Sequence, residues 1–343
     1  MAAILAFGCE ATPIHDPGGG GPQATGGSTG TGGWVTAAPS CQFTEFTVPT
    51  GGCNPHAITR GPDGNVWFTE WAGNKIGRVT PSGSITEFRI PVSQSGAENI
   101  TAGPDGNVWF SEWGFGLNAD NNVGRVTPTG EITEFPIYSG GQIWPFGITA
   151  GPDGNLWFTE LAAGAIGRIS PAGKNVMQFR FPEGEFHEAY DITAGPDGNL
   201  WFTDFGSNTI GRVTTAGEIT QFPVTMGPGG IVVGPDGALW FVESDGDGMP
   251  GQAIARITTD GTISQFPLLD AGTGPSDIAT GPDGNLWFSD NGRNEIGRIS
   301  PDGTVARCQI PTPDSMPERI ALGADGNLWF TEWQGNKIGR VKP

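Results

Sequence analysis

A stretch of twenty residues, Gly61 to Thr80 (GPDGNVWFTEWAGNKIGRVT), recurs seven times along the chain with modest variation. Each copy carries a tryptophan followed by a large apolar residue, and these tryptophans are Trp67, Trp109, Trp157, Trp201, Trp240, Trp287 and Trp329. A repeat of 39 to 48 residues that is rich in glycine and aromatic side chains, without helical periodicity, is typical of propeller blades. We therefore predict an all-β chain that folds as a seven-bladed β-propeller.

Each repeat predicts a blade of four short strands. In the first copy these strands cover residues 57–59, 65–69, 75–80 and 84–90. Pro-Asp-Gly and Pro-Ser-Gly segments separate the strands, and Asp and Gly tolerate the left-handed conformations of tight turns. Apolar and polar residues alternate in Ile85-Thr86-Glu87-Phe88, as a half-buried strand requires.

The two ends of the repeat region predict how the ring closes. Residues 42–49 have the pattern of an outer strand with no blade before it, whereas the last repeat stops at Pro343 without an outer strand. If the N-terminal segment completes the last blade, no sheet edge stays exposed. The propeller is therefore expected to span residues 42–343, closed by its own N-terminal strand.

Residues 1–41 form a separate segment. The apolar run from Met1 to Cys9 resembles the end of a bacterial lipoprotein signal with Cys9 as the lipidated residue, although no Lys or Arg precedes it, which a start codon placed too late would explain. The alternative is an unstructured terminus with an incidental cysteine. The glycine-rich residues 18–33 predict a flexible tether. We expect an exported protein, either an envelope lipoprotein or a periplasmic or secreted one.

The charge balance restricts the partners. Asp and Glu number 36 against 17 Lys and Arg, a formal net charge of −19, which argues against nucleic-acid binding. We expect a monomer with a small-molecule partner. The cysteines are Cys9, Cys41, Cys53 and Cys308. If Cys9 is lipidated, at most one disulfide forms, its pairing is open, and no spacing suggests a zinc site.

Residues present in every blade are expected to serve the blade itself. One such residue is the acid that ends each second strand: Glu70, Glu112, Glu160, Asp204, Glu243, Asp290 and Glu332. Another is the arginine of each third strand: Arg78, Arg125, Arg168, Arg212, Arg256, Arg298 and Arg340. We predict that these acids and arginines form repeated ion pairs that set strand register.

Residues that break the repetition are the better candidates for function. The residue two positions before the inner-strand Ile differs in most blades: His56, Glu98, Phe146, Tyr190, Gly229, Ser276 and Glu318. Ring closure places Glu318, His56 and Glu98 on three consecutive blades around the channel mouth, facing Phe146 and Tyr190, with Trp144 nearby. A polar wall facing an aromatic one is the pattern of a small-molecule site. The imidazole between two carboxylates suits a divalent cation or a general base, whereas the alternative is a solvated rim.

Two loops on the same face are longer than their counterparts, at residues 114–122 and 244–252. Asp245 and Asp247 are spaced like the start of a calcium loop, but the other ligands of such a loop are absent. A solvated turn is the favoured interpretation.

The repeated motifs resemble those of the virginiamycin B lyase (streptogramin lyase) family. The resemblance is carried by Pro55-His56-Ala57-Ile58-Thr59, by Trp67-Phe68-Thr69-Glu70 and by Asn74-Lys75-Ile76-Gly77-Arg78, and it covers residues 42–343. It implies an enzyme that linearises a cyclic depsipeptide antibiotic without water, and hence a role in antibiotic resistance. A base removes the proton alpha to the carbonyl in the linkage's alcohol residue, the ester's carboxylate leaves, and Mg²⁺ offsets the developing negative charge.

The resemblance also assigns residues. His56 matches the family's substrate-contacting histidine in its Pro-His-Ala setting. The family's Glu-Pro-His, which supplies a metal ligand and the base, aligns with Gly96-Ala97-Glu98, so that a carboxylate stands at the base position. A further family Glu is expected where Trp113 stands, one residue after Glu112.

Two hypotheses of different class follow. In the first, the protein is a carbon–oxygen lyase: Glu98 is the base, His56 is a substrate contact or electrophile, and Glu98, Glu112 and Glu318 hold Mg²⁺. Its substrate lies against His56, Trp144, Phe146 and Tyr190. In the second, the protein is a non-catalytic, surface-tethered propeller that uses the same face to bind a ligand or a protein. A propeller of the gluconolactonase or NHL-repeat type is a lesser alternative.

Overall fold

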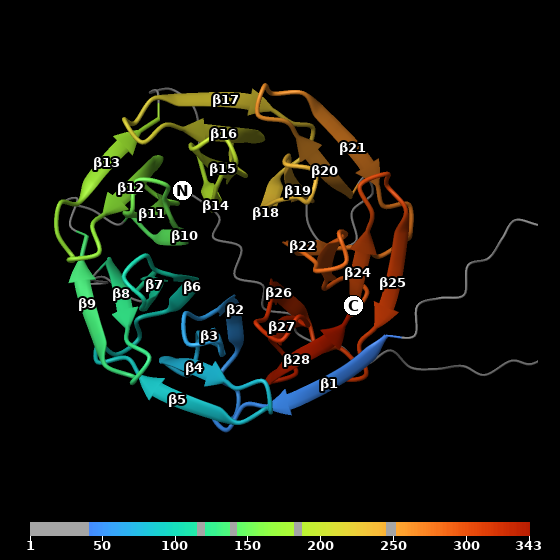
Figure 1. The fold of residues 1–343 in the computed structure, drawn as a ribbon, viewed down its shortest axis with the longest axis horizontal. Helices are drawn as coiled ribbons and strands as arrows, with labels where there is room; N and C mark the ends of the chain where they lie inside the picture. The colour runs from blue at the N-terminus through green and yellow to red at the C-terminus, as the bar shows by residue number, and fades with distance from the viewer. Residues whose placement is uncertain (1–40, 115–120, 138–142, 182–186, 245–251) are drawn as a thin grey trace, which may run out of the picture. The chain divides into compact units, whose positions relative to one another are not determined.

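In the computed structural model, four-stranded antiparallel sheets follow one another around a ring (Figure 1). The structure describes residues 41–114, 121–137, 143–181, 187–244 and 252–343. The predicted lipoprotein signal with Cys9, the glycine-rich tether, Asp245, Asp247 and most of both long loops lie outside these residues. None of the described segments forms a helix with the length and hydrophobicity needed to cross a membrane.

The described residues form seven sheets, and blade 1 consists of β2 to β5. The inner strands are β2 (Pro55–Arg60), β6 (Ala97–Ala102), β10 (Pro145–Ala150), β14 (Ala189–Ala194), β18 (Pro228–Val233), β22 (Pro275–Thr280) and β26 (Pro317–Leu322). The second strands are β3 (Val66–Glu70), β7 (Val108–Glu112), β11 (Leu156–Glu160), β15 (Leu200–Asp204), β19 (Leu239–Glu243), β23 (Leu286–Asp290) and β27 (Leu328–Glu332). The third strands are β4 (Lys75–Val79), β8 (Asn122–Val126), β12 (Ala165–Ile169), β16 (Thr209–Val213), β20 (Ala253–Ile257), β24 (Glu295–Ile299) and β28 (Lys337–Lys342). The outer strands are β5 (Ile85–Arg89), β9 (Ile132–Pro136), β13 (Met177–Arg180), β17 (Ile219–Pro223), β21 (Ile263–Pro267), β25 (Val305–Gln309) and β1 (Gln42–Thr47).

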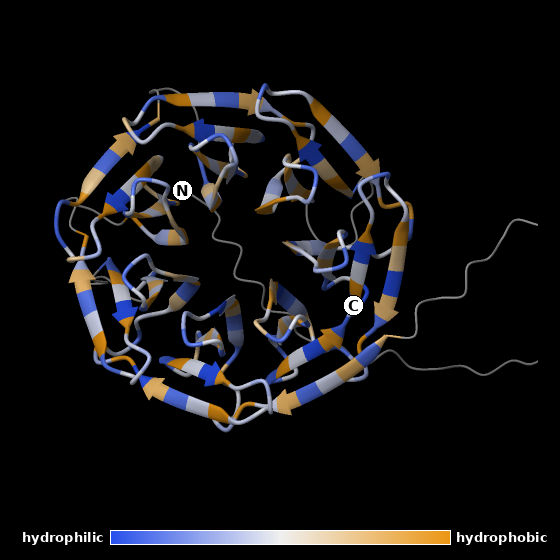
Figure 2. Cartoon of the chain, viewed as in Figure 1, coloured by the Kyte–Doolittle hydropathy of each residue, from blue (hydrophilic) through white to orange (hydrophobic). Residues whose placement is uncertain are grey.

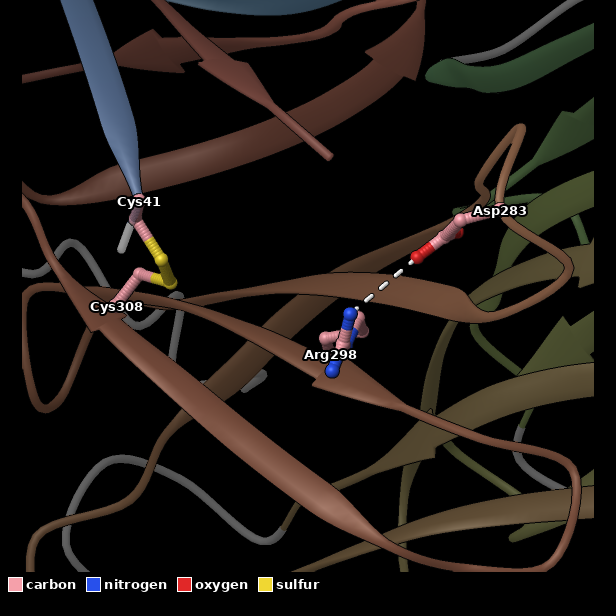
Figure 3. Close-up of a disulfide and its surroundings, with 4 residues drawn as sticks. All are labelled: Cys41, Asp283, Arg298 and Cys308. Carbon is pink, nitrogen blue, oxygen red and sulfur yellow. Dashed lines mark ion pairs between the residues drawn. A yellow bond between two sulfur atoms is a disulfide. The ribbon is translucent and has the colours of Figure 1, made fainter. Parts of the chain in front are cut away.

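The N-terminal strand closes the ring as predicted. β1 pairs antiparallel with β28, with Phe43 opposite Val341, and thereby supplies the outer strand of blade 7 (Figure 1). A disulfide between Cys41 and Cys308 joins the residue before β1 to β25 of blade 6 (Figure 3). Cys53 is buried and free, so the described residues contain one disulfide, within the limit that the sequence set.

The core lies in the seams between blades. The tryptophan of one second strand packs with the phenylalanine of the next blade: Trp67 shares a buried cluster with Phe110, and Trp329 of blade 7 shares one with Phe68 of blade 1. The outer strands cover these seams with alternating residues, which Figure 2 shows as alternating hydrophobic and hydrophilic segments. Because the last tryptophan meets the first phenylalanine, the seam that closes the ring is built like the others.

The aspartate of the turn after each inner strand anchors the buried tryptophan. Asp63 accepts a hydrogen bond from the Trp67 indole nitrogen at 3.0 Å, and the same contact recurs in all seven blades. A Cβ on Gly61 would lie 2.3 Å from the Trp67 ring, so this glycine is required by close packing. The turn and the seam are therefore specified by one short motif.

The predicted pairing of repeated acids with repeated arginines is wrong. Arg78 lies opposite Trp67, at the end of the strand pair near Asp63, whereas Glu70 lies opposite Lys75 at the other end. Arginines of six described blades pair with the turn aspartate at 2.5 to 3.8 Å. Figure 3 shows one such pair, Arg298 and Asp283. Ion pairs with the turn acid thus replace the expected ones.

The repeated acids are instead buried against the middle of the outer strand. Gln178 donates a hydrogen bond to Glu160 at 2.7 Å, and Gln265 donates one to Glu243 at 2.5 Å. Burial raises the pKa of Glu70 to about 8 and the pKa of Glu160 to about 7. These acids are fully buried and serve the blade, as expected, and in Glu70 and Glu160 burial favours the protonated form.

Hydroxyl groups of the second strands connect neighbouring inner strands. Thr69 accepts a hydrogen bond from the Ala57 amide at 2.9 Å and donates one at 3.1 Å to the Glu98 carbonyl of blade 2. Ser111, Thr159, Ser289 and Thr331 make the same two contacts in their blades. This relay fixes the first residues of the inner strands, where the variable side chains lie.

Candidate ligand-binding site

The second residue of each inner strand stands at the same end of the ring, and one of these residues comes from each blade. Strand pairing shifts by a residue there, for instance between Pro55 and Ile58 in β2. Such bulges re-aim a side chain next to a site. The consecutive inner strands β26, β2 and β6 thus place Glu318, His56 and Glu98 side by side, as the sequence predicted.

His56 and Glu98 form a pair in which the carboxylate is buried and the imidazole is 12% exposed. The His56 Nδ1 atom lies 3.2 Å from Glu98 Oε2 and 3.1 Å from the Glu98 backbone oxygen. The other carboxylate oxygen accepts a hydrogen bond from the indole nitrogen of Trp71 at 2.7 Å. Burial by itself lowers the pKa of His56, but the Glu98 carboxylate more than offsets this, so the pKa lies above its usual value. Because Nδ1 faces Glu98, Nε2 is the nitrogen left for a ligand.

Aromatic side chains surround this pair. The His56 ring packs edge-on against Trp333 and Phe146, with ring centroids 5.4 and 6.4 Å away. Phe146 in turn lies 4.4 Å from Tyr190 and 6.1 Å from Trp113. The expected separation into a polar wall and an aromatic wall is therefore not seen, because the imidazole is itself part of the aromatic surface. We call Trp71, Trp113, Trp144, Phe146, Tyr190 and Trp333 the aromatic cluster.

Three members of the aromatic cluster were not predicted from the sequence as site residues. Trp71, Trp113 and Trp333 each follow the repeated acid of a second strand, and they belong to blades 1, 2 and 7. The equivalent residues of the other four blades are Leu161, Phe205, Ser244 and Asn291. The same comparison of blades that singled out His56 would have found these tryptophans one position after the acid.

Trp144, a predicted binding residue, has an unusual backbone. Its φ angle is +50°, and its ring lies 5.3 Å from that of Trp113. The equivalent positions in blades 1 and 2 are Asn54 at +51° and Gly96 at +57°, residue types that tolerate the left-handed region. A tryptophan there carries backbone strain of roughly 1–3 kcal/mol, and such strain is concentrated at functional sites.

The residues expected to hold Mg²⁺ do not converge. Glu112 is fully buried inside blade 2, where burial and then the Glu134 carboxylate raise its pKa. Glu318 accepts a hydrogen bond from Ser276 at 3.1 Å. Nowhere in the described residues do three or more His, Cys, Asp or Glu side chains form a group suited to a metal ion. Among the residues that the structure describes, the donor set therefore does not fit the magnesium site that the resemblance implies.

A second layer of polar residues lies directly below. In four of the seven inner strands the third residue is polar, and these residues, Asn99, Asp191, Asp277 and Arg319, line a cavity of about 220 Å³ in the central channel. These residues stand one position after the variable residues that were predicted from the sequence. Its members also break the repeat, so they could have been found in the same way.

Fold and site together define a seven-bladed propeller with a histidine–glutamate pair in an aromatic-lined channel mouth. The sequence profile of the virginiamycin B lyase family matches residues 33–226 and 187–343, and the chain belongs to this family. Comparison with curated proteins gives no match.

Comparison with solved structures supports the assignment to this family. A streptogramin B lyase is 34% identical, with a TM-score of 0.79 over 88% of this chain and 97% of the other. Virginiamycin B lyase from Staphylococcus aureus is 35% identical, with a TM-score of 0.80 over 89% of this chain and all of the other. A catalytically inactive variant of that enzyme, with quinupristin, matches equally well.

Proposed function

We propose that this propeller binds a cyclic depsipeptide of the streptogramin B class at the channel mouth and opens its ester linkage by elimination. The observation that carries the proposal is the His56–Glu98 pair set inside the aromatic cluster. Aromatic walls suit a ligand with large apolar side chains, and a few polar groups among them fix its orientation. The similarity to the lyase with quinupristin supports the same ligand class.

The geometry favours His56 over Glu98 as the base. Glu98 is buried, and its two oxygens already face His56 and Trp71. A carboxylate in this position orients an imidazole and raises its basicity. In the proposed reaction, His56 Nε2 takes the proton from the alpha carbon, the adjacent C–O bond breaks, and the ester leaves as a carboxylate. The products are one linear peptide with an alkene and a free acid group, and no water is consumed.

Recognition without turnover is the second candidate. It is favoured by Glu98 at the position where the family places its histidine base, and by carboxylates that do not converge on a metal site. Under this alternative, the aromatic cluster and His56 bind the same cyclic ligand but release it unchanged.

Mass spectrometry separates the two candidates. The protein is incubated with quinupristin, with and without magnesium, and the linear product is sought. The lyase proposal expects turnover that EDTA does not abolish. His56→Ala should lower kcat/KM by about 10²–10⁴, whereas His15→Ala, which precedes residues 42–343 in the sequence, should leave it unchanged. Binding by calorimetry without any linear product would establish recognition alone, and neither binding nor product would contradict both.

The pH profile identifies the base. The rate should rise with pH as His56 loses its proton, and the midpoint should lie above the usual histidine value because Glu98 raises the pKa. Glu98→Gln removes the charge but keeps the shape, so it should move this midpoint to lower pH. A midpoint that Glu98→Gln leaves in place would exclude His56 as the titrating base.

We further propose that the protein is exported. The Cys41–Cys308 disulfide supports this proposal, because such bonds persist mainly in oxidising compartments. Cell fractionation with thiol labelling tests it, and a cytoplasmic pool with both cysteines reduced would contradict it.

A further inference from the structure

The polar layer below the channel mouth contains one buried arginine that reaches across the ring. Arg319 of blade 7 places its Nη1 atom 3.4 Å from Asp277 of blade 6 and 3.5 Å from Asp191 of blade 4. Asn99 of blade 2 adds a contact to Asp191 at 3.5 Å. Seam packing and the hydroxyl relay join only adjacent blades, whereas this cluster joins blades that are not neighbours.

Each carboxylate of the cluster is also fixed to the backbone. Asp191 accepts a hydrogen bond from the Ile231 amide of blade 5 at 3.1 Å, and Asp277 accepts one from the Ile320 amide of blade 7 at 3.0 Å. These contacts hold the two carboxylates in place whichever side chain occupies position 319.

Glycines make room for the two aspartates. A Cβ on Gly147 would lie 2.9 Å from the Asp191 Cα atom, and a Cβ on Gly230 would lie 2.2 Å from Asp277 Oδ1. The layer therefore alternates between glycine and aspartate from blade 3 to blade 6. This alternation is absent from the other layers of the inner strands. It indicates that the small residues and the aspartates of this layer are matched to each other by close packing.

Arg319 also touches the aromatic cluster. Its guanidinium lies 5.2 Å from the centroid of the Tyr190 ring, and Tyr190 packs on Phe146, which contacts His56. The Nη2 atom of Arg319 is buried, and no hydrogen bond to the described residues satisfies it. A planar guanidinium stacks on an aromatic ring and pairs with carboxylates at the same time, which an ammonium group cannot do equally well.

We propose that Arg319 is a positioning residue for the channel-mouth site, which holds Tyr190 and through it Phe146 beside His56. The proposal rests on the proposed function, because it concerns the wall against which the depsipeptide would lie. Without the guanidinium, Tyr190 loses the surface beneath its ring, and the two aspartates face each other without a counter-charge. Arg319 itself need not touch the ligand.

Fluorine NMR on protein labelled with 3-fluorotyrosine tests the position of Tyr190 without any ligand. The chain has two tyrosines, Tyr138 and Tyr190, so Tyr138→Phe assigns the spectrum. We expect Arg319→Met to shift or broaden the Tyr190 resonance and Arg319→Lys to shift it less. Arg256→Met is the matched control, because Arg256 pairs with Asp236 in a turn of blade 5.

Calorimetry with quinupristin then relates this position to the site. We expect at least a tenfold loss of affinity for Arg319→Met, a smaller loss for Arg319→Lys and none for Arg256→Met. If Arg319→Met does not fold, Arg319→Lys decides the question by the same two measurements. A Tyr190 resonance and an affinity that match those of the control would overturn the proposal. A shifted resonance in a protein whose wild type binds no quinupristin would support the positioning and contradict the proposed function instead.

Discussion

The repeated acid of the second strand is a residue whose surroundings decide its charge. In blade 3 a glutamine of the outer strand faces it, and in blade 6 Arg307 takes that place and lies 2.5 Å from Asp290. In blade 1 the facing residue is Glu87, which pairs with Lys75 at 2.8 Å. A second ionised carboxylate beside Glu87 is unfavourable, and this adds to the burial that raises the pKa of Glu70.

These raised pKa values predict that stability falls as pH rises. The folded protein holds protons on Glu70 and Glu332 up to their pKa values of about 8 and about 7, whereas the unfolded chain releases them near pH 4.5. Between those limits the native state binds more protons, so the unfolding free energy decreases with pH. Glu70→Gln should remove the part of this decrease in unfolding free energy that Glu70 causes, roughly 2–4 kcal/mol between pH 5 and pH 9.

Chemical denaturation at several pH values between 5 and 9 measures this effect. Glu131→Gln, at an exposed position in the turn before β9, is the matched control and should follow the wild type. A pH dependence that is equally steep in Glu70→Gln and in the wild type would show that Glu70 is ionised in the folded state.

Individual side-chain contacts were harder to predict from the sequence than the strands and turns. Spacing along the sequence places the acid and the arginine on neighbouring strands, but only the register shows that they stand at opposite ends of the pair. His56 and Glu98 were predictable as neighbours, since they hold the same position in adjacent blades. That Trp71 occupies one oxygen of Glu98 was not, because this contact depends on the path of a loop.

At the scale of the strand, the hydroxyl relay explains how inner strands are aligned, and one blade lacks it. Val242 of β19 stands where other blades have Thr or Ser. It is buried in the seam between blades 5 and 6. A Cβ on Gly229 would lie 2.7 Å from a Val242 methyl group and 3.5 Å from the Ser276 carbonyl oxygen, so the valine occupies the place of a bridging hydroxyl.

Val242→Thr should therefore restore the missing link. The new hydroxyl can donate to the Ser276 carbonyl of blade 6 without a change of volume, and we expect stabilisation of about 0.5–1.5 kcal/mol. The converse change, Thr159→Val, removes two existing hydrogen bonds and should destabilise by about 1–3 kcal/mol. Thermal unfolding of both variants tests the pair, and a lower Tm for Val242→Thr would show that blade 5 does not use the relay geometry.

Strands and turns were well predicted because their signals are local. The strands predicted in the first repeat agree with β2 to β5 within two residues at each end. The turn aspartate and the tryptophan that it anchors lie four residues apart, so a single motif specifies both. The members of the polar layer around Arg319 could have been singled out because they break the repeat, but their contacts could not, because they join blades 2, 4, 6 and 7 across the ring.

Ring closure is a property of the whole molecule, and three features support it. Trp329 and Phe68 complete the last seam. Phe46 of β1 stacks on Trp329 at 5.5 Å, and Phe43 packs edge-on against Phe330 at 6.0 Å. The disulfide then ties the start of β1 to blade 6, across 267 residues of sequence.

Removing the disulfide and removing β1 in separate variants should show how much each contributes to the unfolding free energy. Cys41→Ser with Cys308→Ser should lower the unfolding free energy by about 2–5 kcal/mol, because the link constrains a very long loop of the unfolded chain. Reducing agent should lower the Tm of the wild type but not that of the double variant. Deleting residues 42–49 should cost more, since it exposes the edge of β28 and uncovers the rings of Trp329 and Phe330. An unchanged Tm after that deletion would mean that the ring is stable without closure and that β1 contributes nothing to its stability.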